Sequence, residues 1–423
     1  MTRPARTTTT APGPAAGAAP APESPAPLRN PVFGLFLVCG GALVGPLDTA
    51  VNVAFPAMTA AFGLALRDIQ WVVIAFVVAQ SFVTLVSGRL GDLYGHRRIF
   101  AIGMAACVLA HTAAGFAPDY GWLVAMRVLQ GIAVGLAVAC GPALATLLFP
   151  AGDKRRVLAI YVTTFSLGLA LGPLLGGALI QWLGWPGVFW FRVPLALVVL
   201  LLLPLLSDVR ASPGEPVAVA DVDAPARSRI PLPRAAAFRS PAFLHVQFNS
   251  IVINFACFAI MLLVPYALSR WPGESTAAAG VLLAFFPGGS LLGGLLAGRV
   301  HRRMSSAAMM RAGLLLAAIG LVLTALCLPA HSAPALGAAL LVAGLGLGLF
   351  QVGYMDATTS LLPPEDRGVA GGLVTVTRLL GIVLGVTGIS ALHEALASIE
   401  TTIAAMGAGL MLFAAVTAAI RRR

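Results

Sequence analysis

Long apolar runs that alternate with short polar segments are the main pattern of this chain. Each run has about 20 residues with few or no charges, the length an α-helix needs to cross a bilayer core of roughly 30 Å. The pattern predicts an all-α integral membrane protein with twelve transmembrane helices. They fall near residues 33–58, 69–87, 99–117, 121–148, 157–181, 187–206, 242–268, 276–297, 307–328, 335–361, 368–392 and 402–420.

The polar segments divide the chain into units. Residues 1–30 are rich in Pro, Ala and Thr and lack the apolar core of a secretory signal, so we expect a disordered cytoplasmic tail. Residues 207–240 are rich in Pro and Arg and predict a cytoplasmic linker. The sequence thus predicts an N-terminal six-helix bundle over 31–206 and a C-terminal one over 241–423.

The positions of Lys and Arg predict the orientation in the membrane, because short loops rich in these residues stay on the cytoplasmic side. If the chain begins inside, Arg67 and Arg270 are the only basic loop residues on the outer face. We therefore expect a multi-pass protein of the bacterial inner (plasma) membrane with both termini in the cytoplasm. The bases on the inner face are Arg89, Arg97, Arg98, Lys154, Arg155, Arg156, the linker arginines, Arg299, Arg302, Arg303, Arg367 and Arg421 to Arg423.

Composition excludes several classes of protein. With 59% hydrophobic and only 10% charged residues, the chain is too apolar for a water-soluble globular protein. The net charge of +11 does not indicate nucleic-acid binding, because the bases lie in short loops between apolar runs. The five cysteines lie within apolar runs without metal or redox spacing, and no nucleotide-binding loop or catalytic constellation is found. We expect no enzyme activity, cofactor or metal.

The two halves of the chain resemble each other at a spacing of about 210 residues. Gly88-Arg89 corresponds to Gly298-Arg299, Pro56 to Pro265, and the pair Gly168 and Gly172 to Gly381 and Gly385. A constant spacing over three matches indicates a duplicated six-helix unit. In transporters such a repeat places the substrate between the halves near the bilayer midplane.

Four motifs of the first half carry a resemblance to a known family. They are LDTAVNVAFP at 47–56, GRLGDLYGHRR at 88–98, RVLQG at 127–131 and GLALGPLLGG at 168–177. Over residues 33–420 the chain resembles the major facilitator superfamily, and its drug:proton antiporter branch in particular. The resemblance implies two pseudo-symmetric six-helix bundles that rock about a midplane site. The branch commonly has fourteen spans, whereas residues 207–240 leave no room for two additional helices.

The motif at 88–98 predicts a short loop with a tight reversal. Gly95 permits a turn, and Asp92 can bond free backbone amides or the neighbouring guanidinium groups. The alternative is a plain loop that only sets orientation. Leu93 stands where the family usually has a base. The resemblance implies a conformational latch made of Gly88, Asp92, Gly95, Arg97 and Arg98.

Asp48 lies inside the first predicted span, where an ionisable side chain is costly and marks a functional site by default. Apolar surroundings favour its neutral form, so that a proton becomes exchangeable near neutral pH. The resemblance also implies proton coupling at this position. The alternatives are an acid buried for helix packing or one permanently partnered to Asn52 one turn away.

Arg127 lies at a comparable depth in the fourth span. A buried arginine remains charged and needs an acid, a carbonyl group or water. The resemblance implies a proton-coupling role, and the alternative is a side chain that extends to the outer surface.

The fifth span carries a run of small residues that permits close approach of backbones, with a proline that removes a hydrogen-bond donor. Spacing alone indicates packing. The resemblance implies an antiporter motif, which favours export, formed by Gly168, Gly172, Pro173, Gly176 and Gly177.

The second half adds two charges inside spans, Asp356 and Arg378, which we expect to form an intramembrane pair. The pair is either a static clasp or a gating or protonation site. Arg192 at the start of the sixth span attracts an anionic substrate or reaches the outer headgroups, and we favour the headgroups. His111 in the third span is expected to be a satisfied core residue.

A cavity with few polar groups suits lipophilic compounds. Its expected lining includes Asn52, Gln130, Phe165 and Tyr354. The sequence therefore predicts a monomeric secondary transporter in the lipid bilayer that exports small lipophilic or amphipathic compounds in exchange for protons. The alternatives are a proton-coupled exporter or importer of one metabolite, such as an organic anion, and a non-transporting membrane sensor.

Overall fold

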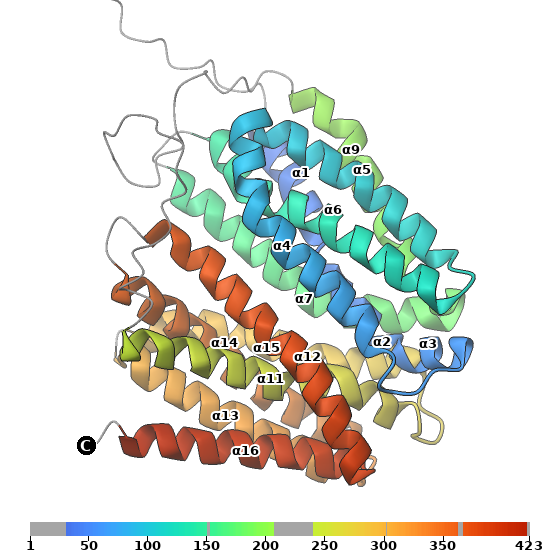
Figure 1. Ribbon diagram of the computed structural model, residues 1–423, viewed down its shortest axis with the longest axis vertical. Coiled ribbons are helices and arrows are strands. Elements are labelled where there is room, and N and C mark those ends of the chain that lie inside the picture. Colours follow the sequence, from blue (N-terminus) through green and yellow to red (C-terminus); the bar gives the residue numbers. More distant parts are fainter. Residues whose placement is uncertain (1–30, 150–152, 207–239, 302, 363–366, 421–423) are drawn as a thin grey trace, which may run out of the picture.

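The computed structural model describes residues 31–149, 153–206, 240–301, 303–362 and 367–420 (Figure 1). Within these ranges twelve helical segments are long and apolar enough to cross a membrane, and no strand is present. The predicted all-α architecture with twelve spans is confirmed. The predicted tail at 1–30 and nearly all of the linker at 207–240 lie outside the described residues.

The first six spans comprise the helices of residues 31–206. The first and sixth are interrupted, since each consists of several short helices. The elements are α1 (Pro31–Leu43), the 3₁₀ turn η1 (Pro46–Thr49), α2 (Ala50–Val53), α3 (Phe55–Phe62), α4 (Gln70–Tyr94), α5 (His96–Gly115), α6 (Tyr120–Leu147), α7 (Lys154–Leu183), α8 (Gly187–Trp190), α9 (Arg192–Leu202) and the 3₁₀ turn η3 (Leu203–Leu206).

The last six spans are single helices. They are α11 (Pro241–Leu268), α12 (Thr276–Val300), α13 (Ser306–Cys327), α14 (Ala333–Leu361), α15 (Arg367–Leu396) and α16 (Ile399–Ile420). Helix lengths repeat between the halves: α4 and α12 have 25 residues each, α7 and α15 have 30 each, and α6 and α14 have 28 and 29. This repetition agrees with the duplicated sequence pattern.

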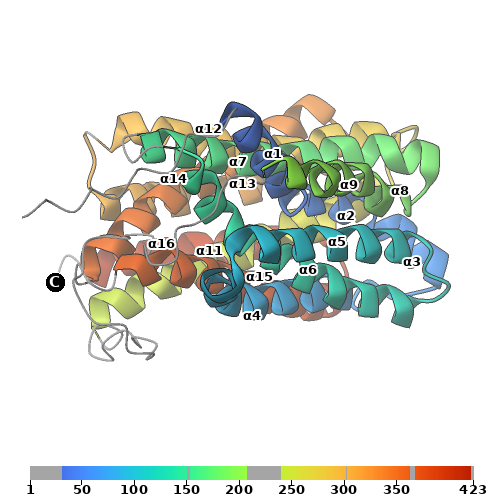
Figure 2. The ribbon, with the colours of Figure 1, turned by 90° about the horizontal axis from the view of Figure 1, so that it is seen from above.

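The two sets of helices form two groups that lie side by side. Figure 1 shows α1 to α9 in one group and α11 to α16 in the other. Two helix pairs provide most of the contact between the groups, α7 with α12 and α4 with α15. Figure 2 shows these pairs at opposite edges of the molecule. The space between the groups is therefore bordered by two helix pairs.

One end of the molecule, here called the basic end, is rich in positive side chains. It holds the reversal between α4 and α5, the beginning of α7 and the end of α12. At the opposite end the chain reverses through Gly63, Gly184 and Gly273, which have positive φ angles of 62°, 69° and 73°. The described bases of the basic end are Arg89, Arg97, Arg98, Lys154, Arg156, Arg299 and Arg303.

The backbones of α7 and α12 touch in the part of these helices nearer the opposite end. A Cβ atom on Gly177 would lie 2.4 Å from the carbonyl oxygen of Thr276, and one on Gly280 would lie 2.5 Å from that of Pro173. Only glycine fits at both positions, because any side chain would force the backbones apart. This contact holds the two groups together at one level of the membrane.

Candidate functional site

The first span is broken at the residues that surround Asp48. Helix α1 ends at Leu43, and the chain resumes as the 3₁₀ turn η1, with Pro46 at its first position and Asp48 inside it. Proline cannot donate a backbone hydrogen bond and disfavours a continuous helix. The predicted uninterrupted helix over 33–58 is therefore wrong in this detail, although the dipeptide Gly45-Pro46 signals the break.

Two arginines converge on the Asp48 carboxylate. Arg127 from α6 donates from Nη1 to Oδ1 and from Nη2 to Oδ2, both at 2.7 Å. Arg192 at the start of α9 donates from Nη1 to Oδ1 at 2.8 Å. The two-point contact with Arg127 is the strong geometry for a guanidinium and a carboxylate. We call Asp48, Arg127 and Arg192 the charged cluster, which carries one more positive than negative charge.

Arg127 makes further contacts with its neighbours. Its Nε donates to the Val72 carbonyl oxygen at 2.8 Å, and its Nη1 also donates to Gln130 Oε1 at 2.8 Å. The guanidinium carbon lies 4.2 Å from the centroid of the Phe76 ring, close enough for a cation–π contact. The side chain is 2% exposed, so Arg127 does not extend to the surface.

The prediction for Arg192 is wrong. We expected it to reach the outer headgroups, yet its side chain is fully buried and pairs with Asp48. The interruption between α8 and α9 positions it for this, since its Nη2 also donates to the Val188 carbonyl oxygen at 3.2 Å. Its Nε has no partner among the described residues. The sequence contained a signal for this pairing, because Arg192 is a second base inside a span near the depth of Asp48.

His111 lies buried in α5 of the same half. Its Nδ1 lies 2.6 Å from the Cys107 carbonyl oxygen, whereas its Nε2 has no partner among the described residues. The expectation of a fully satisfied core histidine thus holds for one ring nitrogen and fails for the other.

The glycine run of α7 packs directly on the broken first span. A Cβ atom on Gly172 would lie 2.0 Å from Thr49 Oγ1, and one on Gly176 would lie 2.9 Å from the Ala50 Cα. Thr49 Oγ1 also donates to the Leu169 carbonyl oxygen of α7 at 3.0 Å. The residues after Asp48, Thr49 and Ala50, are therefore packed directly against α7.

A cavity of about 730 Å³ lies between the two groups of helices. Its α7 lining begins at Val162 and ends at Leu169, on the basic-end side of the Gly177–Gly280 contact. We call it the central cavity. Its lining residues come from both halves: Thr49, Asn52, Val162, Thr163, Ser166, Leu169, Asn254, Cys257, Phe258, Met261, Phe286, Pro287, Ser290, Leu291, Gly294, Leu295, Leu347, Gly348, Gln351, Val352, Met355, Asp356, Thr359, Arg378 and Ile382.

Of the four predicted cavity residues, Asn52 lines the central cavity and the other three do not. Gln130 is buried in the first half, where it accepts from Arg127. Tyr354 is buried and donates to Gln247 Oε1 at 2.5 Å. Phe165 lies outside the stripe of α7 that lines the cavity, which recurs at the helical spacing of Val162, Ser166 and Leu169. For these three residues the prediction is wrong.

The predicted pair of Asp356 and Arg378 is not formed. Both residues line the central cavity, but no ion pair joins them within the described ranges. Asp356 accepts a hydrogen bond from Ser306 Oγ of α13 instead. This hydrogen bond joins the Asp356 carboxyl of α14 to α13.

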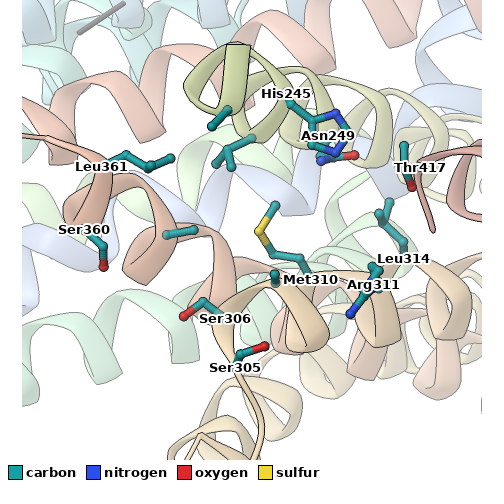
Figure 3. A pocket seen from close by; sticks show the side chains of 14 residues that line it. His245, Asn249, Ser305, Ser306, Met310, Arg311, Leu314, Ser360, Leu361 and Thr417 are labelled. Carbon is teal, nitrogen blue, oxygen red and sulfur yellow. The ribbon is translucent and has the colours of Figure 1, made fainter. Parts of the chain in front are cut away.

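A second cavity of about 460 Å³ lies inside the second half (Figure 3). Among the labelled side chains, His245 and Asn249 come from α11, Met310 and Arg311 from α13, and Thr417 from α16 (Figure 3). Every residue that lines it belongs to the C-terminal group of helices. This cavity therefore does not lie between the two halves, as the central cavity does.

The model of the Major Facilitator Superfamily matches residues 37–386. The chain belongs to this superfamily. The match covers most of the protein, and the family makes the chain a multi-pass membrane transporter and not an enzyme.

Two relatives and one solved structure illustrate the range of the superfamily. The chain is 28% identical over 397 residues to the tetracenomycin C resistance and export protein of Streptomyces glaucescens, which covers 83% of this chain and 74% of the relative. It is 24% identical over 390 residues to the riboflavin transporter RibZ of Clostridioides difficile, 83% of this chain and 86% of the relative. A bacterial homolog of the human lysosomal transporter Spinster has the same fold, with a TM-score of 0.66, 20% identity and coverage of 93% and 95% of the two chains.

In this superfamily member the motif at 88–98 is mostly helical. Helix α4 continues to Tyr94, and the reversal needs only Gly95, whose φ is 90°. Asp92 contacts His96, with 3.2 Å between Oδ1 and Nε2, and no guanidinium. The two partners expected for Asp92, free backbone amides or the neighbouring guanidinium groups, are not found within the described residues. Arg97 Nη2 donates to the Leu203 carbonyl oxygen at 3.1 Å, which joins the beginning of α5 to the end of the sixth span.

Proposed function

We propose that this transporter exports small lipophilic or amphipathic compounds in exchange for protons, with both termini in the cytoplasm of a bacterial cell. One observation carries the proposal. Asp48 is an acid inside a membrane span, and the next residue, Thr49, lines the central cavity and is bonded to α7. Protonation of Asp48 and binding of a compound therefore act on the same short segment.

The coupling follows from the charged cluster. A proton on Asp48 removes the negative charge that the two arginines share, so the contacts at 2.7 and 2.8 Å weaken. The broken segment from Pro46 to Ala50 then shifts against the glycine run of α7. Because α7 also contacts α12 of the other half, this movement favours rocking of the two groups.

The direction of exchange is supported by the state of the cluster. Two guanidinium groups donate to the Asp48 carboxylate within 2.8 Å, and the central cavity lies on the basic-end side of the α7–α12 contact. An antiporter that has released its proton to the cytoplasm and awaits a compound there requires this combination. The positive-inside distribution supports a cytoplasmic location of the basic end.

The lining of the central cavity supports lipophilic compounds as substrates. An apolar part of the wall is formed by Phe258, Met261, Phe286 and Leu295. Uncharged polar groups such as Asn254 can form hydrogen bonds with a compound. The relative from Streptomyces glaucescens is named for resistance to tetracenomycin C and its export. Tetracenomycin C is therefore the first compound to test.

The test uses the purified full chain in proteoliposomes with an imposed pH gradient. We expect uptake of tetracenomycin C into vesicles that are acidic inside, and loss of this uptake when a protonophore dissipates the gradient. Asp48→Asn should abolish the gradient-driven component. Asp68→Asn, which changes a partly exposed acid with 41% side-chain exposure, is the matched control and should transport normally. Gradient-driven transport that survives Asp48→Asn unchanged contradicts proton coupling at this residue.

A further inference from the structure

We propose that Arg378 makes the central cavity selective for apolar aromatic compounds that carry one anionic group, a carboxylate or an ionised phenol. This inference rests on the proposed export function and assigns the chemical class of the exported compound. It starts from a difference among the arginines inside the spans. Arg127 and Arg192 share an acid, whereas Arg378 has neither an ion pair nor a hydrogen bond within the described part of the chain.

The acid that lines the same cavity does not serve as the partner of Arg378 within the described residues. Asp356 lines the same cavity, but its carboxyl accepts from Ser306 and forms no ion pair with Arg378. A guanidinium inside a membrane protein needs a counter-charge or water, because an unpaired buried charge is costly. Arg378 lines the central cavity, so an anion bound there would supply the missing counter-charge.

Arg378 is held in place by its helix. The hydroxyl oxygen of the preceding residue, Thr377, lies 3.0 Å from Gln247 Oε1 of α11 and 2.7 Å from the Leu373 carbonyl oxygen of α15, so it links this turn of α15 to α11. One turn further along α15, Ile382 lines the same cavity. The cation is thus presented by a rigid helix face with an apolar neighbour, an arrangement that favours recognition of an anion attached to an apolar body.

The rest of the cavity limits the number of anionic groups to one. The wall is mostly apolar, and its uncharged polar groups include Asn52, Asn254 and Gln351. The carboxyl of Asp356 would repel a second anion on the same compound. A carboxylate or phenolate matches Arg378 best, because the planar guanidinium donates two parallel hydrogen bonds to an oxyanion.

The experiment compares an acid with its neutral ester, 4-(1-pyrenyl)butyric acid and its methyl ester. Both are fluorescent and have the same aromatic body, so their difference isolates the anionic group. With the purified full chain in detergent we expect binding of the acid to be about tenfold tighter than binding of the ester. Arg378→Gln should abolish this preference and leave the Kd of the ester within about twofold. Arg378→Lys should retain part of the preference, because it keeps the charge without the planar fork.

Arg311→Gln is the matched control, since Arg311 is an arginine of a span that lines the second cavity. This variant should keep the preference for the acid. Size-exclusion chromatography shows whether each variant remains folded, and the ester reports the same for the cavity itself.

Three outcomes contradict the inference: equal affinity of the wild type for acid and ester, a preference that survives Arg378→Gln, or binding of neither compound. Gradient-driven transport of both compounds at equal rates by the wild type would overturn the selectivity and leave proton-coupled export intact. Tight binding of the acid without gradient-driven transport would support the selectivity and contradict the proposed function.

Discussion

The two halves share a glycine packing contact but differ in the helix that it touches. In the first half the glycines of α7 contact a broken span around Asp48, and in the second half the glycines of α15 contact an unbroken helix, α11. A Cβ atom on Gly381 would lie 2.7 Å from the Ile251 carbonyl oxygen, and one on Gly385 would lie 3.0 Å from that of Phe255. The repeated spacing of about 210 residues therefore preserves a packing contact, while the charges beside it differ.

The proposed function and the proposed role of Arg378 assign different tasks to the two halves. The first half neutralises most of its buried charge internally, through a carboxylate shared by two arginines. The second half leaves the Arg378 charge facing the central cavity. A self-contained charged cluster suits proton exchange, and an uncompensated cation suits recognition of a compound. The following variants test this division, in order of the expected effect.

The largest effect is expected from Asp48→Asn, because it leaves two buried arginines without their acid. Breaking a buried ion pair on one side costs about 3–5 kcal/mol. We expect a large decrease in the free energy of unfolding, measured by denaturant titration in detergent. Arg192→Gln should cost much less, since it leaves Asp48 paired with Arg127. The double variant should be more stable than Asp48→Asn alone, and strict additivity of the two changes would show that Arg192 does not share the carboxylate.

Gly177→Leu should come next and should abolish transport without unfolding either group of helices. The added side chain collides with the Thr276 carbonyl oxygen and separates α7 from α12. We expect cysteines introduced near the cavity to become reactive to reagents added from the opposite end. Gly288→Leu is the control and should transport almost normally, because a Cβ atom on this glycine of α12 meets nothing within 4 Å. Equal loss in both variants would argue against the α7–α12 contact as a closing point.

Arg97→Ala should decrease the transport rate severalfold. It removes the hydrogen bond to the Leu203 carbonyl oxygen, which is worth about 1.5–3 kcal/mol for a charged donor. Arg98→Ala removes an exposed arginine of the same motif and should have a smaller effect. Initial transport rates in proteoliposomes measure both, and the reverse order would place the latch on Arg98.

The smallest effects are expected from changes to two buried tyrosines, one in each half. Tyr354→Phe removes the donor to Gln247 and should lower the free energy of unfolding by about 1 kcal/mol. Tyr161→Phe removes a hydroxyl that has no partner among the described residues, so stability should stay equal or rise slightly. Thermal unfolding in detergent ranks the two, and a larger loss for Tyr161→Phe would contradict the assigned hydrogen bonds.

The sequence predicted the spans well, because hydropathy over about 20 residues reports burial in a bilayer regardless of partners. Contacts between distant residues were harder to predict. Arg192 and Asp48 lie 144 positions apart, and their pairing depends on the break between α8 and α9. The predicted pairing of Asp356 with Arg378 is not formed, and the carboxyl accepts a hydrogen bond from Ser306 on a third helix, a contact that hydropathy does not report. Gly45-Pro46 was the one local signal of the broken span that the hydropathy pattern concealed.

The surplus positive charge of the charged cluster has an electrical consequence. A charge that moves through the whole membrane field gains or loses about 2.3 kcal/mol per 100 mV. Any rocking that shifts this cluster along the field therefore does work against the voltage or draws work from it. We expect turnover to depend on the membrane potential even when the exchanged compound is uncharged.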